Sequence, residues 1–302
     1  MRPLTQSDAT GIWIPLVTPF QGVTQQLDLP TAQKLTRHLI DQGIDGLIVG
    51  ATTGESATLS DAEHLQLLDA VIEAAEGQCP VMVGISGSDT RQVVEDVQRY
   101  NIHQRISGFL MSPPAYVRPS QLGIQRHFEA AAAATTLPFI IYNIPYRTGV
   151  NIELPTLQAL NRNPQFIAVK ESGNGNVMQL SQQINETSLN ILSGEDNMIF
   201  VCSCLGGQGA ISAAAHIRPD LYRLMHQHVQ QGRLAEARQI NVALQPLIQL
   251  LFSESNPAPV KAALNIMGLI ESSVRLPMTP ASAGCVERLR EVLPVILELE
   301  FA

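Results

Sequence analysis

The feature that most constrains the fold is a strict alternation of eight short apolar runs with longer segments of helical periodicity. Most of the short runs are continuously apolar, which is typical of parallel strands buried on both faces. Eight strand–helix units in a row predict a closed α/β structure, the (β/α)8 or TIM barrel. The predicted strands are Trp13–Val17, Gly46–Val49, Val81–Gly84, Gly108–Met111, Phe139–Tyr142, Ile167–Val169, Asn190–Leu192 and Gly209–Ser212.

Helical patterns fill the intervals and continue beyond the eighth strand. Within the barrel we predict helices near Pro30–Gln42, Asp61–Ala75, Thr90–Asn101, Ser120–Thr135, Leu154–Asn161, Val177–Ile184, Met198–Leu205 and Pro219–Gln230. Three more patterns follow, near Arg233–Phe252, Pro259–Met267 and Ala281–Leu293. We therefore expect a catalytic barrel over residues 1–230 and an appended helical segment over residues 231–302.

An open, doubly wound sheet is the alternative architecture. Such sheets usually carry a glycine-rich phosphate loop after the first strand, and Pro15–Phe20 is not such a loop. At the start of one helix, Ser60 and Glu63 have the spacing of a capping box, in which each side chain satisfies a free N–H group.

Composition narrows the functional classes. Of the 302 residues, 45% are hydrophobic and 15% charged, which is enough apolar material for a large core. The net charge of −8 argues against a nucleic-acid or anionic-membrane partner. The amino-terminal residues lack the apolar core of a secretory signal, so we expect a cytoplasmic protein in which Cys79, Cys202, Cys204 and Cys285 remain thiols.

Lys170 is the most informative polar residue. Catalytic groups of a (β/α)8 barrel stand at the carboxyl ends of its strands, and Lys170 follows the apolar run Phe166–Val169. Burial there would disfavour the ammonium form and leave a free amine able to attack a ketone. On position alone, an ion pair with Glu171 is the better interpretation, but the residues at the neighbouring strand ends reverse that order.

Those neighbouring strand ends offer complementary groups. Thr52 and Thr53 supply hydroxyl and backbone N–H groups that suit a small carboxylate. Tyr142 supplies a phenol able to pass a proton, and Arg147 a guanidinium able to grip a second carboxylate. Taken singly, the threonines fit an ordinary turn better, Arg147 fits a solvated loop better, and Tyr142 fits a buried structural tyrosine equally well.

Metal and nucleotide chemistry find no support in the sequence. The seven histidines form no cluster with metal-ligand spacing, and no HExxH or CxxC motif occurs. The stretch Gly173–Gly175 is too short for a dinucleotide loop, and Ser56 does not stand in a GxSxG motif. We therefore expect no metal site and no external cofactor.

Several motifs together resemble one known family. They are Gly50–Ser56 (GATTGES), Tyr142–Pro145 (YNIP) and Val169–Glu171 (VKE). They resemble the pyruvate-dependent class I aldolase family, which contains dihydrodipicolinate synthases and N-acetylneuraminate lyases. The stretches Arg118–Ser120, Arg147–Gly149, Asn256–Lys261 and Arg275–Pro280 resemble the synthases in particular. The resemblance runs from the first strand to the last helix.

The resemblance implies catalytic roles for four residues. Lys170 would form a Schiff base with pyruvate, and Tyr142 would donate and accept protons. Thr52 would join a proton relay that Tyr116 completes from a neighbouring subunit. From the sequence alone, a Tyr116 that covers its own barrel mouth is the better interpretation, and only the resemblance reverses it.

It also implies substrate contacts. Thr53 and a backbone group of Ile211 would contact pyruvate, and Gly194 would join this substrate-binding set. Arg147 would hold the carboxylate of L-aspartate 4-semialdehyde. The implied activity is condensation of pyruvate with this aldehyde to 4-hydroxy-tetrahydrodipicolinate, in the diaminopimelate route to lysine. The implied assembly is a homo-oligomer, a dimer or a tetramer.

Three departures from the family pattern concern the aldehyde substrate more than the Schiff base. They are Gly84–Asp89 in place of a Gly-Thr-Gly stretch, Ala115 in place of an aromatic residue, and Ser172 in place of a common alanine. One rival is a related aldolase or lyase acting on a sugar acid or another aldehyde, which Arg147 argues against. The other is a catalytically idle paralogue that binds a keto acid, which the retained Lys170 argues against.

Overall fold

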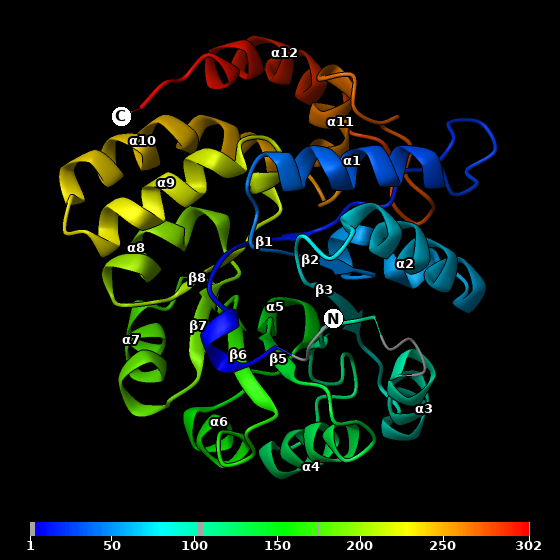
Figure 1. Cartoon of the computed structure of the whole chain (residues 1–302), viewed down its shortest axis with the longest axis vertical. Coiled ribbons are helices and arrows are strands. Elements are labelled where there is room, and N and C mark those ends of the chain that lie inside the picture. The colour runs from blue at the N-terminus through cyan, green and yellow to red at the C-terminus, as the bar shows by residue number, and fades with distance from the viewer. Residues whose placement is uncertain (1–3, 102–104, 174, 302) are drawn as a thin grey trace. The chain divides into compact units, whose positions relative to one another are not determined.

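The strand order confirms the predicted (β/α)8 fold. The computed structural model describes residues 4–101, 105–173 and 175–301. Its eight parallel strands are paired in chain order and close into a barrel (Figure 1). They are β1 (Gly11–Pro15), β2 (Gly46–Val49), β3 (Val81–Ile85), β4 (Phe109–Met111), β5 (Phe139–Asn143), β6 (Phe166–Glu171), β7 (Asn190–Ser193) and β8 (Gly209–Ile211). Each predicted strand is present within two residues of its expected bounds.

The predicted helices are present as well. They are α1 (Leu29–Asp41), α2 (Asp61–Ala75), α3 (Thr90–Asn101), α4 (Gln121–Ala132), α6 (Leu154–Leu160), α7 (Val177–Glu186), α8 (Ile199–Cys204), α9 (Pro219–Gln230), α10 (Leu234–Leu251), α11 (Ala258–Ile266) and α12 (Ala283–Leu297). The sequence analysis missed α5 (Pro145–Thr148), which is too short to show periodicity. The capping box at the start of α2 is confirmed, with Glu63 N–H 3.3 Å from Ser60 Oγ.

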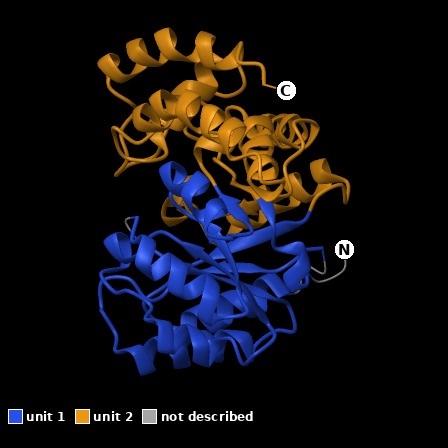
Figure 2. Ribbon diagram, turned by 90° about the vertical axis from the view of Figure 1, so that its left-hand side faces the viewer, with its two compact units in different colours: residues 1–11, 80–211 blue, residues 12–79, 212–302 orange. Residues whose placement is uncertain are grey.

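The chain forms two compact units, residues 1–11 with 80–211 and residues 12–79 with 212–302 (Figure 2). In the first unit, every residue of β5 and β6 is buried, as continuous apolar runs predict. Aromatic rings fill this core: Phe109 and Phe139 stack with centroids 5.2 Å apart, and Phe166 lies 5.9 Å from Phe139. This packing holds β4, β5 and β6 in a fixed register.

In the second unit, β1 pairs with β2 so that Trp13 stands beside Gly46. Any side chain at Gly46 would collide with the indole ring of Trp13, which explains why the first position of β2 is a glycine. The indole is fully buried. It therefore anchors the strand that leads directly into Thr52 and Thr53.

A buried ion pair fixes the loop after β2. Lys261 Nζ on α11 lies 2.7 Å from Glu55 Oε1, and both side chains are almost completely inaccessible to solvent. The same ammonium donates to the carbonyl oxygen of Thr18 at 2.8 Å. Glu55 has a φ of 55°, a left-handed conformation that is strained for a residue with a side chain. The ion pair therefore holds the side chain of a residue whose backbone is strained.

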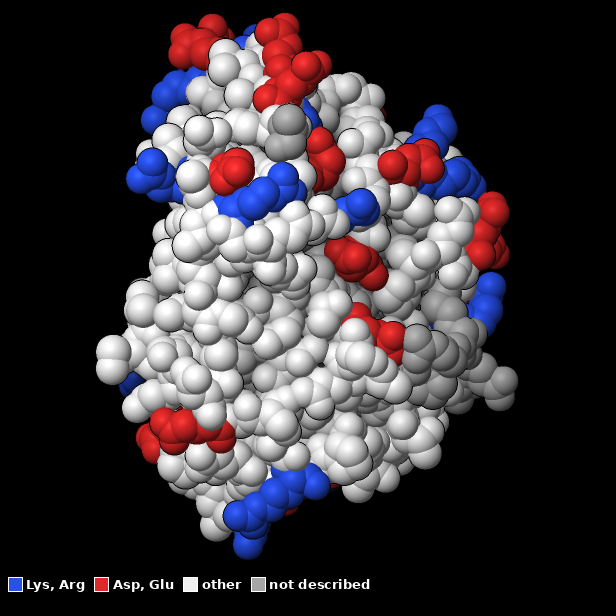
Figure 3. Space-filling view, turned by 60° about the vertical axis from the view of Figure 1, so that its left-hand side comes forward, with Lys and Arg blue, Asp and Glu red and all other residues white. Residues whose placement is uncertain are grey.

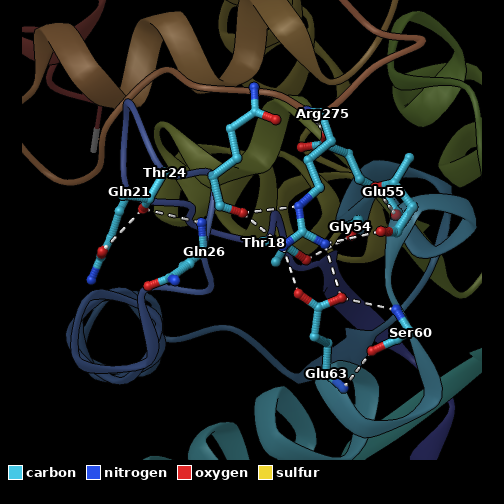
Figure 4. A network of polar contacts seen from close by, with 11 residues as sticks. Thr18, Gln21, Thr24, Gln26, Gly54, Glu55, Ser60, Glu63 and Arg275 are labelled. Atoms are coloured by element: carbon cyan, nitrogen blue, oxygen red, sulfur yellow. Dashed lines mark hydrogen bonds and ion pairs between the residues drawn. The ribbon is translucent and has the colours of Figure 1, made fainter.

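Arg275 extends this network to α2 (Figure 4). Its backbone N–H donates to Glu55 Oε2 at 3.0 Å, and its guanidinium donates to Glu63 Oε2 at 2.9 Å. The guanidinium also lies 4.3 Å from the centroid of the Phe20 ring. The hydrogen bond from Arg275 is the main reason that the pKa of Glu63 is lowered to about 2.

Charge is distributed in small groups on the face shown in Figure 3, where acidic and basic side chains are mixed on a mostly uncharged surface. The net charge of −8 is thus not gathered into one acidic patch on this face.

No helix within the described residues is long and apolar enough to cross a membrane.

The ion pair gives a stability prediction. Lys261→Met should lower the free energy of unfolding by about 3–5 kcal/mol, because it leaves the Glu55 carboxylate buried without its cation. Urea denaturation at one protein concentration measures the change. The control is Arg91→Met, which breaks an ion pair with Asp89 whose side chains are 88% and 55% exposed. That change should cost no more than about 1 kcal/mol. Equal small losses in both variants would show that the buried pair does not stabilise the fold.

Candidate active site

Lys170 is the penultimate residue of β6, and so lies inside the strand and not just beyond it as the sequence suggested. In the barrel register it stands between Tyr142 of β5 and Leu192 of β7. Its side chain is buried, and Nζ lies 4.1 Å from the centroid of the Tyr142 ring. The predicted nucleophile and the predicted proton carrier are therefore adjacent.

Burial changes the protonation of Lys170. Removal from water lowers the pKa of this ammonium to about 8, and the nearby Asp196 and Glu195 carboxylates only partly oppose the effect. Lys170 forms no hydrogen bond or ion pair within the described part of the chain. At pH 7 about a tenth of this amine is thus in the free form that a Schiff-base nucleophile requires, far more than for an ordinary lysine.

Glu171 does not pair with Lys170, so the alternative interpretation of the sequence is wrong. Successive side chains of a strand point to opposite faces, and the Glu171 carboxylate is held on the other face by amides. Asn143 Nδ2 donates to both carboxylate oxygens at 3.0 Å, and Gln183 Nε2 donates to Oε2 at 2.5 Å. Burial raises the pKa of Glu171, and these amide donors oppose the rise. This network ties β6 to β5 and α7.

Tyr142 is a buried phenol whose pKa is raised mainly by burial. The Ser172 hydroxyl lies near enough to favour the ionised phenol, although Ser172 Oγ has no partner at normal hydrogen-bond geometry among the described residues. The phenol therefore carries its proton at neutral pH. It can give that proton to a neighbouring group and recover it, which is the role predicted for it.

Gly194 makes room for the lysine. Its backbone N–H donates to the carbonyl oxygen of Glu171 at 2.7 Å, which brings the end of β7 against β6. A Cβ atom at this position would collide with Ser172 Oγ and stand 2.9 Å from Lys170 Cγ. Only glycine leaves this space open beside the reactive side chain.

Two further predicted residues of the first unit are Ile211 and Arg147. Ile211 is the last residue of β8 and is buried. Arg147 lies on α5 and is exposed, with Cζ 5.7 Å from the Tyr146 ring centroid. Its positive charge lowers the pKa values of both Tyr142 and Lys170. Arg147 is thus close enough to influence the reactive pair while its guanidinium remains open to solvent.

Tyr116 is not packed into this group. Its side chain is 92% exposed, and its φ of 72° is left-handed. Its backbone N–H donates to the carbonyl oxygen of Thr148 at 3.2 Å, which fixes the loop but not the phenol. The Tyr116 side chain thus makes little contact with the rest of its own chain.

Thr52 and Thr53 lie in the second unit, in the 3-10 turn η2 (Thr52–Gly54) directly after β2. Thr52 is exposed and Thr53 is buried. Asn256 Nδ2 lies 3.0 Å from Thr53 Oγ1. Asn256 begins the motif Asn256–Lys261, but no role for it could be predicted from the sequence, because a contact across 203 positions leaves no local pattern.

Within residues 4–101, 105–173 and 175–301, no three His, Cys, Asp or Glu side chains form a group that could hold a metal ion. Cys202 is buried and Cys204 is exposed. All four cysteines are free thiols.

Comparison with known proteins decides the family. The sequence model of the dihydrodipicolinate synthetase family matches residues 8–295. The chain belongs to this family. A family member from Nitratidesulfovibrio vulgaris strain DP4, named 4-hydroxy-tetrahydrodipicolinate synthase, is 38% identical over 287 residues, covering 94% of this chain and 97% of that protein. The protein named 4-hydroxy-tetrahydrodipicolinate synthase 2 from Clostridium acetobutylicum is 37% identical over 289 residues, covering 94% of this chain and 99% of that protein.

Solved structures agree. A dihydrodipicolinate synthase from Cyanidioschyzon merolae with lysine bound is 34% identical with a TM-score of 0.92, covering 97% of this chain and 99% of that one. A chloride-inhibited synthase from Acinetobacter baumannii complexed with pyruvate is 32% identical with a TM-score of 0.91, covering 96% and 99%. The family fold thus accounts for nearly the whole chain.

The lowered pKa of Lys170 gives a pH prediction for this family member. With a pKa of about 8, the free amine increases about tenfold per pH unit below that value and levels off above it. The initial rate of borohydride-trapped adduct formation with pyruvate should rise in the same way between pH 6 and 9. A rate that keeps rising about tenfold per pH unit through pH 9, without levelling off, would show an ordinary, solvated lysine.

Proposed function

We propose that this chain is a lyase that condenses pyruvate with L-aspartate 4-semialdehyde to 4-hydroxy-tetrahydrodipicolinate, in the diaminopimelate route to lysine. The observation that carries the proposal is the buried Lys170, with its pKa lowered to about 8, beside Tyr142 in a chain of the dihydrodipicolinate synthetase family. A free amine, a protonated phenol and an open space at Gly194 are what Schiff-base formation with a small keto acid needs.

The reaction begins at Lys170. The amine attacks the pyruvate ketone, and loss of water gives an iminium ion. The iminium withdraws electrons, so a methyl proton leaves and an enamine forms. The enamine carbon attacks the aldehyde of the second substrate, whose own amine then displaces Lys170 and closes the ring. Tyr142 carries protons between these steps. No external cofactor is required, because the iminium itself is the electron sink.

The remaining residues bind and orient the substrates. We assign Thr53, the backbone of Ile211 and Gly194 to the binding of pyruvate. Thr52 joins the proton relay. Arg147 is assigned to the carboxylate of the semialdehyde, and its exposed guanidinium near Tyr142 supports this role, because a second substrate must reach it from solvent.

The decisive test is covalent trapping. Borohydride added with pyruvate should attach the reduced pyruvate unit to the peptide that contains Lys170, as mass spectrometry will show. Lys170→Arg should abolish trapping while the protein stays folded, because a guanidinium does not form the imine. With L-aspartate 4-semialdehyde added, the intact protein should release a cyclic product. Trapping on another lysine would refute the mechanism, and turnover only with other aldehydes would refute the assigned substrate.

We propose further that the protein is cytoplasmic and works as a homo-oligomer, a dimer or a tetramer, in which Tyr116 reaches the active site of a neighbouring subunit. The 92% exposure of Tyr116 supports this assignment, because the phenol is free to enter another chain. We also propose that residues 1–230 form the catalytic barrel and residues 231–302 its helical appendage.

Complementation tests the Tyr116 assignment. Tyr116→Phe and Lys170→Ala chains should each be nearly inactive as pure proteins. Unfolded together and refolded, mixed dimers contain one site that combines an intact Lys170 with the partner subunit's intact tyrosine, and this site should regain activity. If Tyr116 acts within its own chain, no mixed dimer has a complete site, and the mixture stays as inactive as its parents.

A further inference from the structure

Asn256 connects the C-terminal helices to the loop that carries Thr53. It lies between α10 and α11, and its Nδ2 atom is 3.0 Å from Thr53 Oγ1. Its other polar atom, Oδ1, is buried and has no hydrogen-bond partner among the described residues. Among the described residues, the side-chain amide of Asn256 therefore forms its hydrogen bond with the Thr53 hydroxyl.

The direction of this hydrogen bond matters. An amide nitrogen only donates, so Thr53 Oγ1 is the acceptor, and the hydroxyl keeps its single hydrogen. No described residue accepts that hydrogen. A carboxylate is the acceptor with which a hydroxyl forms its stronger bonds. The Thr53 hydroxyl is thus left as a donor for an anionic ligand.

The backbone beneath the hydroxyl is held by the same helical segment. Lys261, five residues after Asn256, binds Glu55 and the carbonyl oxygen of Thr18. The Thr18 hydroxyl in turn donates to the carbonyl oxygen of Gly54 at 2.6 Å. Rotation of the Thr53 side chain is therefore the main freedom left at this position, and the contact with Asn256 limits it.

We propose that Asn256 is a positioning residue for pyruvate: it holds Thr53 Oγ1 as an acceptor and so turns the hydroxyl hydrogen toward the substrate carboxylate. The inference rests on the proposed function, because it takes Thr53 as a pyruvate ligand. Through Asn256, the C-terminal segment would take part in substrate binding by orienting the Thr53 hydroxyl, which lies outside that segment.

Asn256→Asp is the sharpest variant, because it keeps the shape of the side chain and reverses the hydrogen bond. A carboxylate only accepts, so the Thr53 hydroxyl would donate to it and be lost to the substrate. The pyruvate concentration that half-saturates borohydride trapping at Lys170 should rise about 10- to 100-fold, the effect of losing one hydrogen bond to a charged group. The trapping rate at saturating pyruvate should be largely retained.

A double-mutant cycle distinguishes an effect on the orientation of the Thr53 hydroxyl from an effect of the added charge or of lost stability. Asn256→Ala should raise the half-saturating concentration less than Asn256→Asp does, and it should add nothing in a Thr53→Val background. The matched control is Asn265→Ala on α11, whose amide donates to the carbonyl oxygen of Ile270 at 2.9 Å. This variant shows how much stability is lost when a side-chain amide of this segment is removed. Its half-saturating pyruvate concentration should equal that of the parent protein.

Two results would overturn the inference. An Asn256→Asp variant with unchanged pyruvate dependence would show that the hydroxyl already donates to Asn256 in the parent protein. Full additivity of Asn256→Ala and Thr53→Val would show that the two side chains act separately. A parent protein that forms no adduct at Lys170 would instead remove the proposed function, and this inference with it, so the two failures are distinguishable.

Discussion

The removal of the Lys170 ammonium from water is the constraint on which the chemistry of this chain depends. A lysine on a surface strand would be almost fully protonated at neutral pH and would not attack a ketone. Placing the same side chain within β6 lowers its pKa to about 8. In the strand register, Tyr142 and Leu192 stand on either side of it.

A second buried lysine shows why this environment is specific. Lys261 is also withdrawn from water, and burial lowers its pKa, but the Glu55 carboxylate at 2.7 Å opposes that shift. Glu195 and Asp196 influence Lys170 only at longer range, without a hydrogen bond to its ammonium. One lysine is thus equipped as a structural cation and the other as a nucleophile, and the difference is a carboxylate at hydrogen-bond distance.

The sequence predicted the repeating parts of the fold and the residues at the strand ends. The eight strands and their helices follow from periodicity, and Lys170 follows from one apolar run. Contacts between distant residues were not predictable. Neither the amide network around Glu171 nor the contact between Asn256 and Thr53 has a local pattern, because each depends on how separate elements pack. For Tyr116 the residues alone favoured a side chain that covers its own barrel mouth, and only the family resemblance pointed outward, as its 92% exposure does.

The end of β6 shows how a strand can serve structure and chemistry at once. Because side chains alternate, Lys170 and Ser172 share one face while Glu171 takes the other. The amides that donate to Glu171 lie on the face opposite Lys170 and hold the strand there. The backbone that carries Lys170 is thus fixed without hydrogen bonds to side chains on the reactive face. That face is then left to the phenol of Tyr142 and the space beside Gly194. A nucleophile anchored through its neighbour keeps its own amine unbound, which is the condition its reaction requires.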